Sequence, residues 1–140
     1  MLQLYSETSG GKLVLNNHNI VFENKVEQTG CTATANTPTN TINLNKAGFY
    51  LVHFNAVISN DNAINEFISV IMQNKGVDIS SAQAGATSSS DTDIENIDFT
   101  ALIRVRPSCC SVDNSARLQF KVTGSNALVY FANVVITKIA

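Results

Sequence analysis

The sequence predicts an all-β fold, and three observations carry this prediction. Asn, Thr, Ser and β-branched residues dominate the 140-residue chain, and these residue types disfavour helices and suit strands joined by tight turns. No segment sustains an apolar period of 3.6 residues. Short apolar or alternating segments recur instead between clusters of Gly, Asn, Asp or Ser, a pattern typical of a sandwich or barrel.

The first half of the chain is expected to hold five of these strands. A polar stretch at 28–40 follows the first two, and Ala47-Gly48 then turns the chain into a long apolar segment. Turns are expected at 60–62 and 74–76, because Asn and Gly tolerate the positive φ that tight turns require. The strands predicted here are residues 13–15, 20–22, 41–44, 49–59 and 66–73.

The second half is expected to hold four more strands. Residues 87–93 and 107–115 are predicted loops, and 123–126 is a predicted turn. No linker or repeat divides residues 1–140, so we expect one domain, and residues 1–12 can be interpreted as an N-terminal arm. The predicted strands are residues 77–86, which have the weakest pattern, then 94–105, 116–122 and 127–139.

Charge is scarce in this sequence. Only 14% of residues are charged, against roughly 25% in ordinary soluble domains, so the surface is rich in Asn, Ser and Thr or is covered by another subunit. The nine Lys and Arg residues are scattered and the net charge is −2, which argues against nucleic-acid binding. The longest apolar runs are too short to insert into a membrane, and no secretion signal is recognised at the N-terminus.

Two of the long strands are apolar on both faces. The segment 94–105 alternates cleanly, whereas 49–59 and 127–139 carry apolar residues on the face opposite the core as well. In a chain without helices, such a second face is expected to be covered by another copy of the chain, although an internal loop could also cover it. The residues assigned to the core are Phe22, Tyr50, Val52, Phe54, Phe99 and Phe131, and those assigned to the interface are Phe49, Leu51, His53, Leu102, Tyr130, Ala132 and Val134.

The sequence resembles the TNF-like superfamily of tumour necrosis factor ligands and complement-type globular heads. The resemblance lies in short pieces in the right order, of which the Gly48-Phe49-Tyr50 strand start and the terminal aromatic strand are the most specific. It implies a ten-stranded jelly-roll sandwich that forms a homotrimer, with Phe49, Leu51, His53 and Tyr130 approaching the threefold axis. The matching pieces are residues 20–22, 29–30, 42–44, 47–54, 70–76 and 129–132.

Two segments depart from the animal members of that superfamily. Residues 80–93 carry no receptor-binding signature, and the 107–110 loop differs in kind. The chain is more similar to the bacterial and phage branch, which implies a non-enzymatic structural or binding role. The expectation is a trimeric virion-surface component of a bacteriophage, either a capsid decoration or a head-fibre protein, which binds other virion proteins or a cell-surface glycan. The alternative is an adhesion or lectin module on a bacterial cell or spore surface.

Candidate sites for chemistry are few. His53 would meet its symmetry mates near the axis, as an ordinary interface residue or as a threefold metal or anion site, and its protonation below about pH 6 would then weaken the trimer. Asp91, Asp93 and Glu95 could offer oxygen ligands to calcium, but the segment lacks the glycine and spacing of a calcium loop, so a solvated acidic edge is favoured.

The cysteines and the catalytic motifs of known enzyme classes are the last candidates for chemistry. Cys31, Cys109 and Cys110 do not form a disulfide framework and are expected to be reduced thiols, although the redox state of Cys109 and Cys110 is left open. No nucleophile elbow or HExxH pattern occurs. We therefore expect no enzyme activity, no cofactor and no metal.

Overall fold

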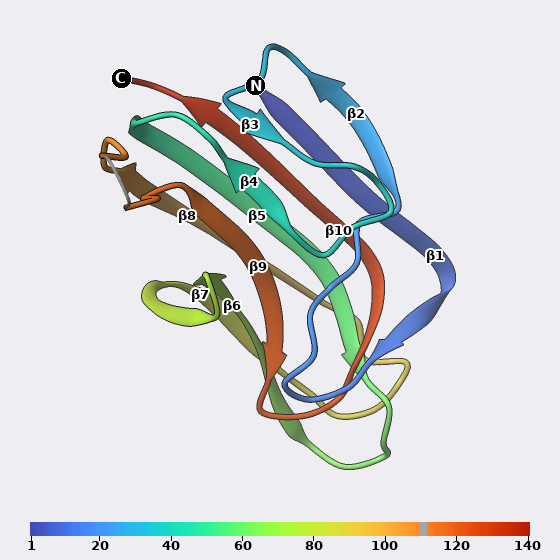
Figure 1. Cartoon of the computed structure of the whole chain (residues 1–140). Helices are drawn as coiled ribbons and strands as arrows, with labels where there is room; N and C mark the ends of the chain where they lie inside the picture. The colour runs from blue at the N-terminus through green and yellow to red at the C-terminus, as the bar shows by residue number, and fades with distance from the viewer. Residues whose placement is uncertain (110–111) are drawn as a thin grey trace.

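The computed structural model describes residues 1–109 and 112–140, and in these residues the chain forms ten strands in two antiparallel sheets (Figure 1). Sheet 1 has the order β2-β1-β10-β5-β8, and sheet 2 has the order β3-β4-β9-β6-β7. The two sheets stack as a sandwich. The strands are β1 (Leu2–Val14), β2 (Asn24–Gln28), β3 (Ala33–Thr34), β4 (Ile42–Leu44), β5 (Gly48–Asn60), β6 (Glu66–Asn74), β7 (Val77–Ser88), β8 (Glu95–Val105), β9 (Ala116–Thr123) and β10 (Ala127–Lys138).

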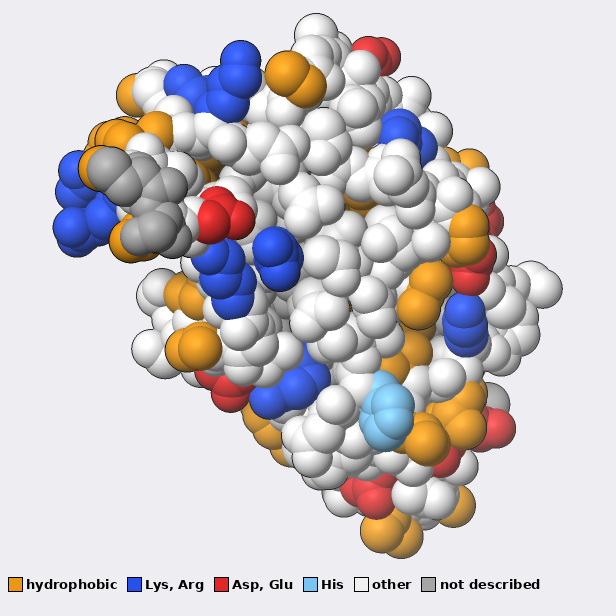
Figure 2. All heavy atoms as spheres, viewed as in Figure 1, with side chains coloured by type: hydrophobic (Ala, Val, Ile, Leu, Met, Phe, Trp, Pro, Cys, Tyr) orange, Lys and Arg blue, Asp and Glu red, His pale blue; other side chains and the backbone are white. Residues whose placement is uncertain are grey.

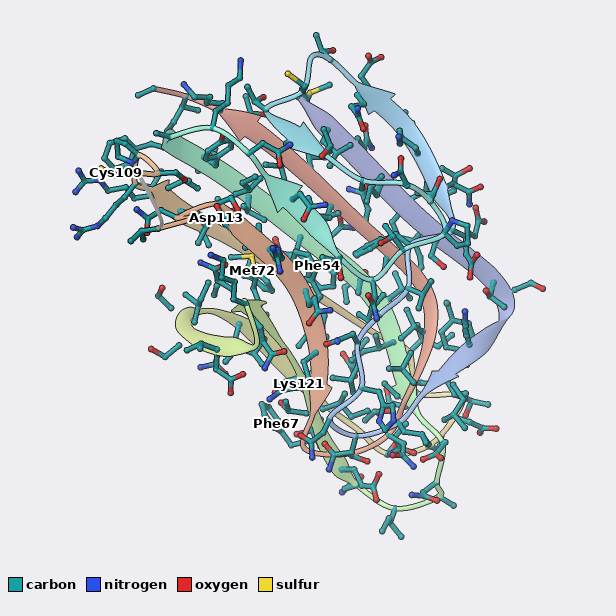
Figure 3. All side chains as sticks on the ribbon, in the orientation of Figure 1. Phe54, Phe67, Met72, Cys109, Asp113 and Lys121 are labelled. Atoms are coloured by element: carbon teal, nitrogen blue, oxygen red, sulfur yellow. The ribbon has the colours of Figure 1, made fainter. Side chains whose placement is uncertain are left out.

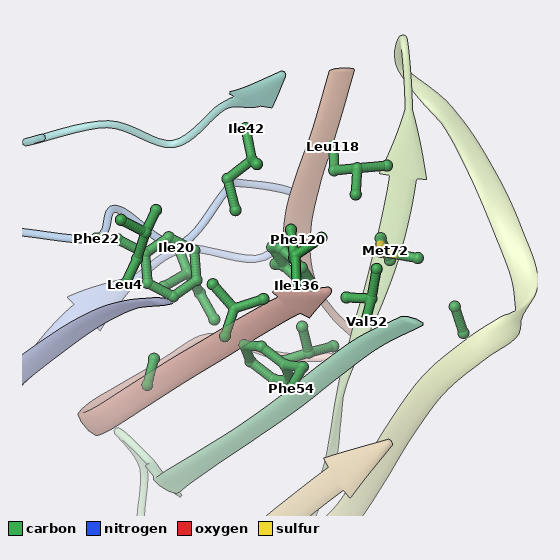
Figure 4. Packing of buried hydrophobic residues seen from close by; sticks show 14 of the residues in the cluster. Leu4, Ile20, Phe22, Ile42, Val52, Phe54, Met72, Leu118, Phe120 and Ile136 are labelled. Atoms are coloured by element: carbon green, nitrogen blue, oxygen red, sulfur yellow. The ribbon is translucent and has the colours of Figure 1, made fainter. Parts of the chain in front are cut away.

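The core lies between the two sheets and is filled by side chains that alternate along the long strands. Phe120 of β9 stacks on Phe54 of β5 with ring centroids 4.9 Å apart, and Phe22 meets Phe120 edge to face at 5.7 Å. Figure 4 shows these rings in the buried cluster that also contains Ile136 and Leu4. Phe99 completes the aromatic group at 5.2 Å from Phe54. Of the residues predicted to be core, Phe22, Tyr50, Val52, Phe54 and Phe99 are buried.

The N-terminal segment is a strand and not an arm. β1 pairs with β10 along most of its length, and Leu2 and Leu4 are fully buried. The predicted strand at 13–15 is therefore the end of a much longer one. Two further short strands were not predicted: β2 ends at the first residue of the polar stretch 28–40, and β3 lies within that stretch. Residues 20–22 form no regular strand; Phe22 makes an isolated bridge to Thr39, and the Ile20 N–H donates to Phe120 O at 2.8 Å.

The turn into β5 requires a glycine. Gly48 has a φ of 144°, and a Cβ atom there would collide with the main-chain oxygen of Ala140. The close approach exists because the C-terminal residues continue the pairing of β10 with β5, through hydrogen bonds from the Phe49 N–H to Ala140 O (3.0 Å) and from the Ile139 N–H to Phe49 O (2.8 Å).

The described residues contain no helix long and apolar enough to cross a membrane.

Candidate assembly face

The outward side of β10, β5 and β8 carries an unusual set of side chains, and we call it the assembly face. The zone near the start of β5, which we call the upper zone, is apolar. There Leu51 on β5 lies directly opposite Leu102 on β8, and Phe49 adjoins them. These three side chains are 41%, 57% and 38% exposed, respectively, although the residues between them on the same strands are buried. The Arg104 guanidinium lies 5.7 Å from the Phe49 ring centre and covers the end of this zone.

A second apolar zone lies lower on the same face. Phe131 of β10 is paired with Val57 of β5, and the Tyr5 ring of β1 stacks on Phe131 with centroids 6.4 Å apart. The Tyr130 hydroxyl donates to the main-chain oxygen of Asp91 at 2.9 Å and lies 3.2 Å from the Ser59 hydroxyl. Tyr130 is therefore held against the loop before β8, beside this zone.

A polar band separates the two apolar zones. His53 of β5 hydrogen-bonds to the Thr100 hydroxyl across the strands at 3.0 Å. One row lower, Asn133 Nδ2 donates to Asn55 Oδ1 at 3.1 Å, and Gln3 Nε2, from the His53 row on β1, donates to Asn133 Oδ1 at 3.0 Å. The band encloses a shallow hollow of about 500 Å³, which is lined by His53, Asn55, Asn96, Ile97, Asp98 and Asn133.

The last strand differs from its predicted alternation. Ala132 and Val134, predicted to lie at the interface, are fully buried in the core, and Phe131, predicted to be core, lies on the outer face. The cause is a register shift between Val129 and Phe131, where β10 has one residue more than β5. Beyond this bulge the inward and outward positions of β10 exchange, and Tyr130 and Phe131 are both left outside the core.

The remaining predicted interface residues lie on the assembly face. Phe49, Leu51, His53 and Leu102 are all exposed and belong to neighbouring rows of β5 and β8. Three further residues of the face were not predicted from the sequence: Asn55, Asn133 and Gln3, whose hydrogen bonds join three strands. Their signal in the sequence was an amide flanked on both sides by apolar residues.

The structure gathers most of the cations at one end of the sandwich. Six of the nine Lys and Arg residues lie at strand ends or in loops there, although they are scattered in the sequence. Figure 2 shows blue side chains gathered toward this end, and Figure 3 shows Cys109 and Asp113 there as well. Of the described residues that line the hollow on the assembly face, Asp98 carries the only carboxylate. The six cations are Lys46, Lys75, Arg104, Arg106, Arg117 and Lys138.

The same end contains the predicted loop at 107–115, in which Cys109 and Cys110 are adjacent in the sequence. Hydrogen bonds from Ser115 hold the pKa of Asp113 below its usual range, with smaller contributions from Lys75 and Arg117. Lys75 Nζ donates to the main-chain oxygen of Asp113 at 2.9 Å and so ties the loop to the turn between β6 and β7. Cys31 and Cys109 are exposed, and Cys110 lies outside the described residues.

The acidic loop before β8 contains a pair of coupled carboxyl groups. Asp93 Oδ2 accepts hydrogen bonds from the Ser89 N–H (2.8 Å) and hydroxyl (3.0 Å), which lower the pKa of Asp93. A hydrogen bond to Asp93 and the charge of Asp93 raise the pKa of Glu95. Asp91 contributes its main-chain oxygen to Tyr130 and Ser59. In residues 1–109 and 112–140, no three His, Cys, Asp or Glu side chains are grouped to hold a metal ion.

We expect Glu95→Gln to raise the melting temperature at pH 7. A carboxyl group whose pKa is raised by folding binds its proton more tightly in the folded state, so it lowers stability as the pH rises above its ordinary pKa of 4.5. The glutamine cannot ionise and removes this loss. Thermal melts of both proteins at pH 4 and pH 7 measure the effect: the difference should be present at pH 7 and small at pH 4, and an equal difference at both would contradict it.

Comparisons with known proteins agree on the fold. No protein-family model matches the sequence, and no curated protein matches it significantly. Among solved structures, the PRD1 vertex protein P5 superposes with a TM-score of 0.59 at 20% identity, over 99% of this chain and 96% of that chain. Murine APRIL at pH 5.0 gives 0.61 at 11% identity over 99% and 98%, and Eiger TNF from S. frugiperda gives 0.65 at 16% identity over 99% and 91%. The chain therefore has the ten-stranded jelly-roll fold of the TNF-like proteins.

Proposed function

We propose that this protein is a non-enzymatic, trimeric component of a bacteriophage virion surface, acting as a capsid decoration or head-fibre protein that binds other virion proteins or a host glycan. The observation that carries the proposal is the assembly face, where Phe49, Leu51 and Leu102 remain 38–57% exposed on the flat side of a sheet. Contiguous apolar side chains on a monomer surface mark an interaction site.

Two further observations support a structural role. The PRD1 vertex protein P5 has the same fold over nearly its whole length, and its name places that protein at a vertex. Two pairs of polar side chains on the face are engaged in cross-strand hydrogen bonds, His53 with Thr100 and Asn133 with Asn55. Side chains that are already paired in this way cost less to cover with a partner than unpaired ones.

The mass of the purified chain in solution tests the assembly. We expect native mass spectrometry and light scattering to give about 45 kDa at micromolar concentration, three times the 15.1 kDa of one chain. A mass of 15.1 kDa at these concentrations would remove the basis of the proposal. For the location, antibodies raised against the chain should label the outside of intact virus particles, and labelling of bacterial or spore surfaces alone would contradict it.

A further inference from the structure

The polar band on the assembly face runs straight across the strands. Asn133 and Asn55 are direct cross-strand partners, and Asp98 is the partner of Asn55 on the other side. Gln3 of β1 lies one row away, opposite Val135, and its side chain joins this row by a diagonal hydrogen bond to Asn133. We call the linked side chains of Gln3, Asn133 and Asn55 the amide ladder.

The ladder is open at its β8 end. Asn55 accepts a hydrogen bond from Asn133, but among the described residues neither Asn55 Nδ2 nor the Asp98 carboxylate makes a side-chain hydrogen bond. Both groups line the hollow in the middle of the face. An amide donor and a carboxylate acceptor are therefore exposed in the same row of the sheet. A second copy of this chain, placed without displacement along the strands, presents the complementary group to each of them.

The position of the band makes sliding along the strands unfavourable. Outward side chains repeat every two residues, so a partner displaced by one row moves by about 6.7 Å. Such a shift would place the Asn55 amide and the Asp98 carboxylate of one copy against apolar side chains of the next. Buried polar groups without partners are strongly disfavoured, whereas apolar zones tolerate many registers.

We propose that the polar band sets the register between copies and thereby closes the assembly into a ring; this rests on the trimer proposed above. Copies related by rotation about an axis parallel to the strands keep the same height, and only zero displacement along that axis gives a closed ring. A constant displacement at each contact gives an open-ended helical assembly instead. The ladder and Asp98 penalise that displacement, and the two apolar zones supply the attraction.

The double substitution Asn55→Val with Asn133→Val tests the proposal by replacing the two linked asparagines of the band with apolar side chains. Native mass spectrometry and light scattering are run from 1 to about 100 µM. We expect the unaltered chain to stay at one trimeric mass over this range. The double variant should show a concentration-dependent series of larger masses, with at least a tenfold greater fraction above the trimer.

A matched control separates register from surface hydrophobicity. Asn43→Val with Gln119→Val adds comparable apolar groups to half-buried outward positions of sheet 2, and this variant should remain a closed trimer. Circular dichroism checks the strand content of each variant, and Asn55→Val alone, with a smaller fraction of large masses, replaces a double variant that fails to fold. If the double variant remains a closed trimer, or if the control grows equally, the register proposal is overturned while the trimer stands. A monomeric unaltered chain overturns both.

Discussion

Replacing Phe120 with alanine is expected to lower the free energy of unfolding by about 3–5 kcal/mol, a large part of the roughly 5–15 kcal/mol that stabilises a domain. Phe120 is fully buried and lies against three other rings, with centroids 4.9 Å from Phe54, 5.7 Å from Phe22 and 6.2 Å from Phe99. These partners come from β5, the segment before β2, and β8. The cavity left by the ring would therefore lie between the two sheets and remove contacts on both of them. The surrounding strands cannot move in to fill it without losing their pairing.

Urea denaturation followed by circular dichroism measures this effect. All proteins are compared at one chain concentration, because assembly adds a concentration-dependent term to stability. Phe67→Ala is the matched control, since the Phe67 ring is 57% exposed on the outer side of sheet 2, and its loss should cost much less. A loss below about 1.5 kcal/mol for Phe120→Ala would show that these rings do not form the central contact between the sheets.

The sheet cores were predictable where alternation is regular. In β8 the inward positions are apolar and most outward ones polar, so period two places Phe99 inside. In β5 both faces carry apolar residues, but the same period groups Tyr50, Val52 and Phe54 on one face, and the strands pair without a shift from Gly48 to Ile58. Sequence period is a local property. It succeeds wherever the backbone keeps its pleat.

The errors arise where the pleat or the pairing is set by distant residues. No glycine or proline marks the bulge in β10, yet its extra residue reverses the assignment of Phe131, Ala132 and Val134. β1 was missed although Leu2 and Leu4 alternate, because its second half, from Glu7 to Lys12, is polar and its register with β10 shifts there. The gathering of cations at one end depends on which strand ends are neighbours, and that is a property of topology.

We expect Leu51→Asp to convert the assembly into monomers without unfolding the chain. Leu51 is 41% exposed in one chain, and its inward neighbours Tyr50 and Val52 are fully buried, so the substitution leaves the core intact. Burying the exposed part of a leucine contributes about 1 kcal/mol, and three copies lose about 3 kcal/mol on substitution. That alone weakens the trimer by more than about a hundredfold, and the desolvation of three carboxylates near one another adds to it.

The measurement is the mass of the variant by light scattering and native mass spectrometry across the concentrations used for the unaltered chain, with thermal melts to show that it folds. Val77→Asp is the matched control, because Val77 is 68% exposed at the start of β7, on sheet 2, and should be replaceable without loss of assembly. The upper apolar zone is one of two, so a Leu51→Asp protein that keeps its trimeric mass would assign the attraction to the lower zone of Val57, Phe131 and Tyr5. The same substitution at Val57 would then separate the copies, and retention of the trimer in both variants would mean that the copies do not meet through this face.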